Sequence, residues 1–401
     1  MLKDVFVTGM GIITAIGETA DETLQALKSG YSPKAPARRF ETALKDFPVC
    51  EVLAGNEALM SGLPLLPQDK PYSRTSLLAL NAAGQALQSS PSKVPVKRMG
   101  LVSATTVGGM DYNEEHYGDL SSGKVNADSF EILDCADSTQ KIAEYFNICY
   151  NVTTVSTACS SSANAIIVGA RMLQNGLADK VLVGGADALS RFTINGFNSL
   201  DIVSPTGCTP FDANRNGITL GEGAAYLVLE TRETAAGDSI LCRLSGFANT
   251  NEAYHQTALS PDGEGAALTV REALKRACLD AGDIDYINAH GTGTVINDLS
   301  EGRAVESVFG ACGAFGKIPP LSSTKAFTGH TLAAAGAVEA VISILAIGNG
   351  LLFANCGFSQ QMPELSFTPN IALAEADVRH VLSNSFGFGG SNASLIFSKV
   401  S

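Results

Sequence analysis

Two segments of this chain share a pattern that strongly limits its fold. Residues 157–176 (TACSSSANAIIVGARMLQNG) and 329–350 (GHTLAAAGAVEAVISILAIGNG) each begin with small residues, continue as an apolar helix and end in Asn-Gly. Later in each half a glycine-rich turn leads into an apolar strand, at 221–230 and 389–398. The offset of about 170 residues is too long for a solenoid repeat. The pattern therefore predicts a duplicated α/β unit; the alternative is that any two α/β halves look alike at this level.

Strand and helix signals alternate along the whole chain, which indicates an α/β protein. A polar turn at residues 233–238 (ETAAGD) follows a predicted strand and marks the joint between the halves. We therefore expect an N-terminal half of residues 1–235 and a C-terminal half of residues 236–401. The stretch 101–150 is polar and irregular, and we expect it to be an insertion in the first half.

Composition excludes several classes of protein. The net charge of −13 disfavours nucleic acid as a partner, because neutralising phosphates requires clustered Lys and Arg. Nine irregularly spaced cysteines without a CxxC pair favour neither a disulfide framework nor a zinc site. The first residues read as a strand and loop rather than a signal peptide. No uninterrupted apolar stretch of about 18 residues predicts a membrane span, so we expect a cytoplasmic protein.

The helix predicted at 331–348 is apolar on almost every side, which is typical of a helix at the centre of a protein. Glu339 is the acidic exception within it. A lone buried carboxylate is costly, so Glu339 needs a partner of opposite charge.

Cys159 lies where a predicted strand gives way to a predicted helix. The β-branched run 152–155 (VTTV) precedes it, and a helical stretch from 165 to 176 follows. At a helix N-terminus, free N–H groups and the helix dipole favour the thiolate, and small neighbours leave room for a substrate. Cys159 is therefore a candidate nucleophile; the alternative is one more small apolar residue in the core.

Two histidines occupy unusual settings. His290 ends a predicted strand and opens HGTGT, whereas His330 ends KAFTGH at the start of the apolar helix. Both positions suit a cleft, and the alternative is a histidine that is hydrogen-bonded within a turn. Metal binding is not favoured, because His290 and Asp298 lack a ligand spacing and no third ligand is near in the sequence.

A glycine-dense turn near the end of the chain completes the candidate site. In residues 384–392 (NSFGFGGSN), backbone N–H groups can point into a cavity that Phe386 and Phe388 line. A tight loop between two strands would show the same residues.

The segments TACSSS, HGTGT, KAFTGH and NSFGFGGSN occur in this order over most of the chain. Together they resemble the β-ketoacyl-acyl-carrier-protein synthases, condensing enzymes of the thiolase-like family, in their Cys-His-His branch. The resemblance runs from the first strand (VFVT) to the last (SLIFSK). It implies an α/β fold of five layers, α-β-α-β-α, duplicated with internal pseudo-twofold symmetry.

The resemblance also implies an activity, which is decarboxylative Claisen condensation of an acyl group, carried on a Cys thioester, with malonyl-acyl-carrier protein. The β-ketoacyl-acyl-carrier protein that forms belongs to fatty-acid or polyene and polyketide-like biosynthesis. Cys159 would be acylated, with the N–H groups of Cys159 and Phe388 as its oxyanion hole. The malonyl carbonyl would bind His290 and His330. Lys325 completes the implied catalytic set and should pair with Glu339, which lies about two and a half helical turns after His330.

Further residues follow from the same resemblance. Thr292 and Thr294 match positions that bind the pantetheine arm, and Asp298 and Glu301 match acidic positions that support the site. Phe388 would gate an acyl pocket bounded at its far end by Val107. No cofactor of its own is implied, since the acyl carrier protein brings the phosphopantetheine. A homodimer, or a heterodimer with a related synthase subunit, is expected to form by pairing of strand 152–156.

Departures from the family pattern leave other functions open. Residues 197–211 lack the arginine that fatty-acid elongation enzymes often place there, and Val295 replaces the usual proline after HGTGT. Both differences leave room for a specialised lipid pathway, with Lys70 and Arg74 as candidates for a basic docking patch or as plain surface residues. One alternative is a non-catalytic chain-length partner. Another is a non-decarboxylative thiolase, although the late loop lacks its second cysteine.

Overall fold

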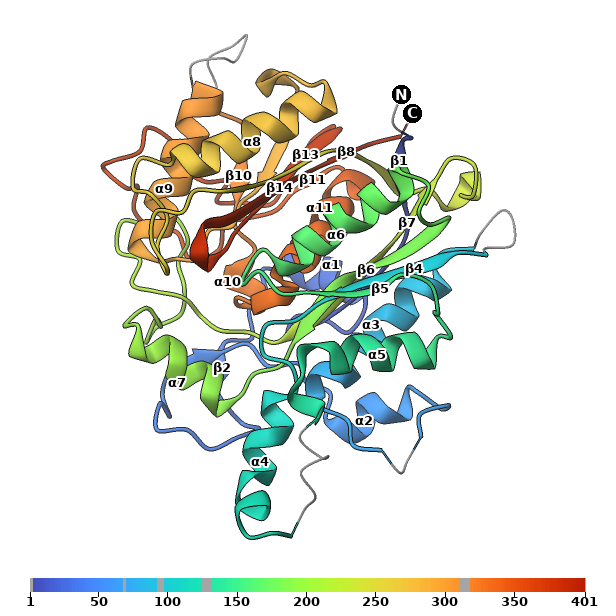
Figure 1. Cartoon of the computed structure of the whole chain (residues 1–401). Coiled ribbons are helices and arrows are strands. Elements are labelled where there is room, and N and C mark those ends of the chain that lie inside the picture. The colour runs from blue at the N-terminus through green and yellow to red at the C-terminus, as the bar shows by residue number, and fades with distance from the viewer. Residues whose placement is uncertain (1–2, 68–69, 92–96, 125–130, 311–317, 401) are drawn as a thin grey trace.

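The computed structural model of the protein describes residues 3–67, 70–91, 97–124, 131–310 and 318–400. Helices pack on a ten-stranded sheet (Figure 1). The strands of this sheet are β1 (Val5–Thr14), β4 (Met99–Ala104), β5 (Val152–Val155), β6 (Lys180–Asp187), β7 (Gly223–Thr231), β8 (Cys242–Asn251), β9 (Tyr286–Asn288), β10 (Leu321–Ser322), β13 (His380–Phe386) and β14 (Ser391–Ser398). The start of β1 and the end of β14 lie close together, since Phe6 and Ser398 both pair with Arg243 of β8.

The order of these strands confirms the predicted duplication. The sheet runs β10-β9-β13-β14-β8-β1-β7-β6-β4-β5, with β1 and β8 paired antiparallel at its centre. Outward from this pair, each half contains its first, fifth, fourth, second and third strand in turn. The directions match too, because the two inner pairings of each half are antiparallel and the two outer ones parallel.

The elements stack in the five expected layers, α-β-α-β-α, in which the strands of each half lie between two layers of helices. The middle layer holds α6 (Ser161–Gln174) and α11 (Ala335–Asn349), which pack on each other and on strands of both halves. Gly336 permits this close crossing, because a Cβ there would lie 2.8 Å from the backbone nitrogen of Ala163. The outer layers are α3 (Arg74–Gln88) with α5 (Cys135–Tyr145) on one side, and α8 (Glu264–Ala277) with α9 (Val295–Val305) on the other.

The helical stretch Leu332–Asn349 is long and apolar enough to cross a membrane by length and composition. In the structure, 89% of it is buried inside the protein, against strands of both halves. It is therefore the central core helix that its apolar pattern predicts.

The expectation that residues 101–150 form an insertion is wrong for much of this stretch. The first residues of this stretch belong to β4, a largely buried strand that lies between β6 and β5 in the sheet. Near the end of the stretch, α5 packs on the sheet. Among the described residues of this stretch, α4 (Met110–Ser121) extends away from the layers (Figure 1). The apolar residues of β4 were not recognised as a strand because most of the sequence that follows them is polar. The predicted joint at residues 235 and 236 falls between β7 and β8, and we propose that the halves divide there.

The remaining elements are short or peripheral. They are α1 (Ala20–Ser29), α2 (Asn56–Ser61), α7 (Arg191–Ser199), α10 (Lys325–Thr328), the strand pairs β2 (Ala35–Pro36) with β3 (Pro48–Val49) and β11 (Leu351–Leu352) with β12 (Ala374–Glu375), the 3-10 turns η2 (Gly237–Ser239), η3 (Ala281–Asp283), η5 (Leu332–Ala334) and η6 (Phe388–Gly390), and the π-helical turn η4 (Glu306–Gly310).

Candidate active site

Cys159 lies on a tight turn between β5 and α6, two residues before the helix begins. The turn forces Ala158 to a φ of 52°, a strained conformation for a residue with a side chain. Ser161 holds the turn: its Oγ donates to the Ala158 carbonyl at 2.6 Å and accepts from the Thr157 N–H at 2.8 Å. This geometry points the sulfur toward the centre of the molecule, where Cys159 is only 6% exposed.

The electrostatics of Cys159 differ from the sequence-based expectation of a favoured thiolate. Burial raises the pKa of the thiol to about 11. The positive charge of Lys325 and the backbone N–H groups of Phe388 and Cys159 lower this pKa, but they do not outweigh desolvation. The N-terminus of α6 alone therefore does not produce a resting thiolate.

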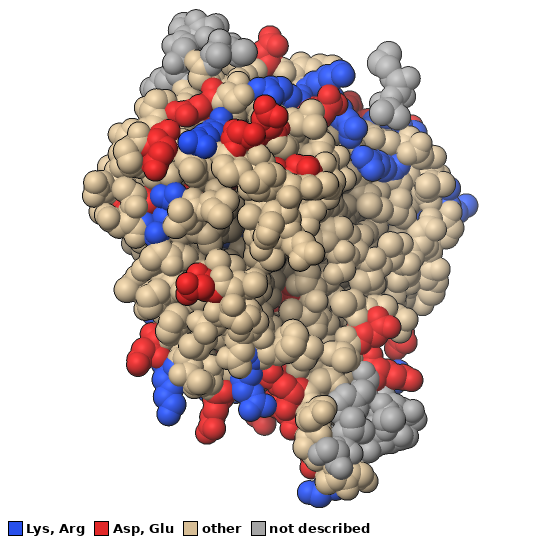
Figure 2. Space-filling model, turned by 60° about the vertical axis from the view of Figure 1, so that its left-hand side comes forward, with Lys and Arg blue, Asp and Glu red and all other residues tan. Residues whose placement is uncertain are grey.

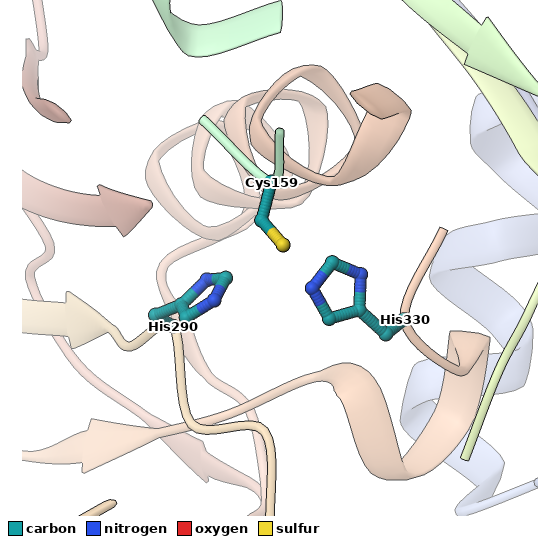
Figure 3. A group of neighbouring side chains, drawn as sticks. All are labelled: Cys159, His290 and His330. Carbon is teal, nitrogen blue, oxygen red and sulfur yellow. The ribbon is translucent and has the colours of Figure 1, made fainter. Parts of the chain in front are cut away.

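Figure 3 shows the Cys159 sulfur pointing between the rings of His290 and His330. One ligand-type atom from each of the three side chains lies within 4.8 Å of the others. The two imidazole rings are 5.4 Å apart between centroids and nearly perpendicular, at 89°. The fold thus brings together side chains from three segments of the chain. Cys159 and His290 are more than a hundred residues apart in the sequence.

The hydrogen bonds fix the tautomers of both histidines. The Lys325 ammonium donates to Nδ1 of His290 at 3.2 Å, and the Leu332 N–H donates to Nδ1 of His330 at 3.0 Å. Each ring therefore carries its proton on Nε2. Nε2 of His330 has no hydrogen-bond partner among the described residues, so it is free to donate to a bound molecule.

Burial keeps both histidines neutral. It lowers the pKa of His290 and of His330 well below the usual value, and the positive charge of Lys325 lowers both further. Two neutral imidazoles with Nε2–H groups can stabilise negative charge on an oxygen between them.

The same tautomers bear on metal binding. Sequence spacing suggested no third ligand near His290, whereas the fold places Cys159 and His330 beside it. A metal ion, however, requires a free lone pair on each Nε2, and these atoms carry the ring protons. Moving the proton to Nδ1 would break both hydrogen bonds described above. The donor set therefore fits hydrogen-bond donation better than metal binding.

Lys325 and Glu339 form the expected ion pair, and both side chains are 2% exposed. The Lys325 ammonium also donates to the His290 carbonyl at 2.6 Å. Burial raises the pKa of Glu339, and the charge of Lys325 opposes this rise. The pair thus anchors α11 to the loop that carries His290.

Two buried carboxylates shape that loop. Glu301 accepts the backbone N–H groups of His290 at 2.9 Å and Gly291 at 2.8 Å, while Asp298 accepts that of Gly293 at 3.2 Å. Burial raises the pKa of Glu301 to about 7, and the N–H donors oppose this. Both side chains lie on α9, so the helix sets the position of the loop.

Thr292 and Thr294 follow His290 and line the same cavity, with their hydroxyl oxygens 2.8 Å apart. The cavity has a volume of about 220 Å³ and reaches Cys159, His290 and His330. A hydroxyl pair at this position can bind the amides of an extended arm.

Phe386 and Phe388 lie on the wall of this cavity, as the glycine-dense turn predicted. Phe388 stacks on Phe197 of α7, with ring centroids 6.0 Å apart. Gly389 adopts a φ of 79°, which lets the chain turn directly after Phe388. Val107 does not line the cavity; it packs against a cluster that includes Ile218, a residue of the cavity wall. Its place at the end of an acyl pocket stays a prediction.

Two residues of the site carried no predicted role. Phe197 provides the stacking partner of Phe388, and Arg215 fixes the start of α9 by donating to the carbonyls of Thr294 at 3.2 Å and Val295 at 2.6 Å. No local sequence pattern indicates the role of Phe197 or Arg215, because both roles depend on contacts with residues far away in the sequence.

The expected basic patch does not include Arg74. This side chain is buried, and its guanidinium pairs with Glu222 at 2.7 Å and donates to the carbonyls of Val52 and Ala54. Lys70 is exposed and pairs with Glu144 at 3.3 Å. Arg74 is therefore a structural cation rather than a docking residue.

Comparison with known proteins identifies the family of this chain. Family models of β-ketoacyl synthase match the chain, the N-terminal domain over residues 2–235 and the C-terminal domain over 241–359. The 3-oxoacyl-[acyl-carrier-protein] synthase 2 of Coxiella burnetii is 33% identical over 420 residues, which cover 99% of both chains.

Solved structures extend the likeness to the fold. The ishigamide ketosynthase/chain length factor superposes with a TM-score of 0.91 at 30% identity, over 100% of both chains. The ketosynthase ApeO, solved with its chain length factor ApeC from Xenorhabdus doucetiae, gives 0.85 at 32% identity, over 99% of this chain and 98% of that one. The chain therefore belongs to the β-ketoacyl synthase family, the condensing enzymes of fatty-acid and polyketide biosynthesis.

Proposed function

We propose that this synthase joins an acyl group held on Cys159 to a malonyl group held on acyl carrier protein. The observation that carries the proposal is the pair of Nε2–H groups, on His290 and His330, that face the Cys159 sulfur. The reaction consumes one acyl thioester, one malonyl thioester and one proton. It releases carbon dioxide, one free carrier and β-ketoacyl-acyl-carrier protein.

In the loading step, the sulfur of Cys159 attacks the carbonyl of an acyl thioester. The N–H groups of Cys159 and Phe388 stabilise the oxyanion, and the thiol proton leaves with the departing carrier thiol. Because burial raises the pKa of Cys159, the proton is lost as the substrate binds and not beforehand.

In the condensation step, the malonyl thioester carbonyl accepts hydrogen bonds from His290 and His330. The bond to the carboxylate then breaks, carbon dioxide leaves, and the two N–H donors stabilise the enolate oxygen. The enolate carbon attacks the acyl carbonyl on Cys159. When this intermediate collapses, Cys159 leaves as a thiolate and takes a proton from water.

The surrounding residues position these groups. Lys325 holds the tautomer of His290, Glu339 holds Lys325, and Glu301 with Asp298 fixes the loop. Thr292 and Thr294 bind the pantetheine arm, Phe386 and Phe388 shape the entry to the acyl pocket, and Val107 closes its far end.

The complete set of reactive groups argues against the alternatives. A non-catalytic chain-length partner has no need of Cys159 with two neutral histidines beside it. A non-decarboxylative thiolase needs a second reactive cysteine, and the wall formed by residues 386–390 contains none.

The partners follow from the relatives and from the sheet. The Coxiella relative is named for acyl carrier protein, and ApeO was solved in complex with its chain length factor. In this chain β5 ends the sheet, and its outer edge pairs with no other strand of the described residues. We infer a homodimer or a heterodimer that joins at β5 and works in the cytoplasm, in a fatty-acid, polyene or polyketide pathway.

Mass spectrometry of the intact protein tests the proposal. After incubation with acyl-carrier proteins that carry acyl groups of graded chain length, the wild type should gain the mass of one acyl group on Cys159. Cys159→Ala should fold and gain none, because the substitution removes little packing. Acyl mass on the Cys159→Ala protein would overturn the assignment.

A further inference from the structure

The first turn of α9 exposes two large aliphatic side chains at the mouth of the cavity. Val295 is 60% exposed and Ile296 47% exposed, and both line the cavity that leads to Cys159. The face that carries α7 and α9 is hollowed, and its middle is almost free of charged side chains (Figure 2). Exposed apolar residues around a substrate channel are typical of a surface that a partner covers.

The charges near this mouth do not suit an anionic partner. Among the described residues that line the cavity, Asp201 is the one with a formal charge, and it is negative. Arg215 is close in space but is 9% exposed, and its guanidinium is occupied by the carbonyls of Thr294 and Val295. The net charge of −13 adds a repulsive field for acidic surfaces.

We propose that Val295 and Ile296 form an apolar docking contact for the carrier protein. The inference rests on the proposed function, since it supplies the occupant: a carrier whose arm enters beside Thr292 and Thr294 sits over the residues that follow them. The carrier therefore presents an apolar side chain next to its arm, and this side chain covers Ile296. The exposed side chain of Val295 adds to this apolar surface.

This mode of docking has a distinct physical signature. Apolar burial is nearly insensitive to salt, whereas attraction between exposed charges is screened within a Debye length. Carrier binding should accordingly change less than about twofold between about 50 and about 300 mM NaCl. A carrier held by ion pairs would lose about tenfold or more over this range.

Substitution separates docking from chemistry. We compare acylation of Cys159 by acyl-carrier protein with acylation by the same acyl group on free pantetheine. Ile296→Asp should lower kcat/KM for the carrier substrate at least about tenfold, through KM, and this loss should exceed the loss for acyl-pantetheine at least about threefold. Ile296→Leu should restore carrier affinity. The matched control is Ile371→Asp, because Ile371 is 65% exposed and lies outside the cavity.

Each outcome decides the matter. A steep salt dependence, an unchanged carrier KM in Ile296→Asp, or an equal loss with both substrates would overturn apolar docking. Failure of the wild type to acylate Cys159 from either substrate would instead overturn the proposed function.

Discussion

The ammonium of Lys325 lies 3.2 Å from Nδ1 of His290 and donates a hydrogen bond to it. An ammonium has no lone pair, so the proton of this imidazole must lie on Nε2, on the side that faces Cys159. Glu339 holds the ammonium in place from α11. A buried ion pair therefore determines which histidine nitrogen can donate to a substrate.

Loss of Lys325 should destabilise the protein more than loss of the whole pair. Lys325→Met leaves Glu339 as an unpaired buried carboxylate, which costs about 3–5 kcal/mol of unfolding free energy. The double variant Lys325→Met with Glu339→Gln should recover much of this loss. Chemical denaturation measures both, and equal stabilities would contradict the role of the ion pair.

The stability of the Lys325→Met variant should also depend on pH. Burial raises the pKa of Glu339 in the folded state, so the folded protein binds the proton more tightly than the unfolded chain. The free energy of unfolding of the variant should thus fall as the pH rises from the pKa of Glu339 in the unfolded chain toward its higher pKa in the folded protein. Denaturation at pH values of about 6 and about 8 should show the larger loss at the higher pH.

Removal of either histidine should block decarboxylation. His290→Ala and His330→Ala each lose an Nε2–H donor to the enolate, so malonyl decarboxylation should fall more than about tenfold. Acylation of Cys159 should survive at least in part. Release of carbon dioxide is the measurement, with His255→Ala as the control because His255 is exposed and outside the cavity. Wild-type rates in either variant would refute this role.

Alkylation of Cys159 should accelerate steadily with pH. Because burial raises its pKa to about 11, the thiolate fraction should grow about tenfold per pH unit below that value. Peptide mass spectrometry after treatment with iodoacetamide can follow Cys159 separately, with exposed Cys149 as the internal reference. A plateau near neutral pH would indicate a resting thiolate instead.

The exposed edge of β5 should mediate assembly. Val152 is exposed on this strand, and a charge on a sheet edge opposes pairing with another strand. Val152→Lys should thus weaken the dimer and, by loosening the turn that follows β5, slow acylation of Cys159. Light scattering reports the assembly, and a stable, active monomer at micromolar concentration would contradict the prediction.

Val107 should limit the length of the acyl chain. Val107→Phe should exclude longer chains by overfilling a packed space, at about 1–3 kcal/mol. The acyl-chain profile of the variant is compared with that of the wild type. An unchanged profile would mean that Val107 does not border the chain.

Local sequence patterns predicted much of this molecule. The small-residue turns before the two apolar helices identified the duplication, and the motifs around Cys159, His290 and His330 identified the site. The sequence also predicted that Glu339 has a partner of opposite charge, because a buried carboxylate in an apolar helix needs one. These features succeed because each depends on a few neighbouring residues.

Features that depend on the whole fold could not be predicted. Arg74 looked like a surface cation, yet its partner Glu222 is 148 positions away in the sequence. The raised pKa of Cys159 results from burial by many segments, which outweighs the local effect of the helix terminus. The apolar residues at the start of the stretch 101–150 form a buried strand, β4, and its place in the sheet depends on its neighbours β5 and β6.

The mirrored sheet has a consequence for how the enzyme divides its chemistry. Of the three reacting side chains, the first half supplies the sulfur, from the turn before α6, whereas the second half supplies both imidazoles, from the loop after β9 and from the turn before α11. Two copies of one architecture have thus become unequal halves, one nucleophilic and one electrophilic. A break in the backbone after residue 235 would leave neither fragment able to react alone. Reassociation of the halves, through the pairing of β1 with β8 and the packing of α6 on α11, would be needed to restore a working enzyme.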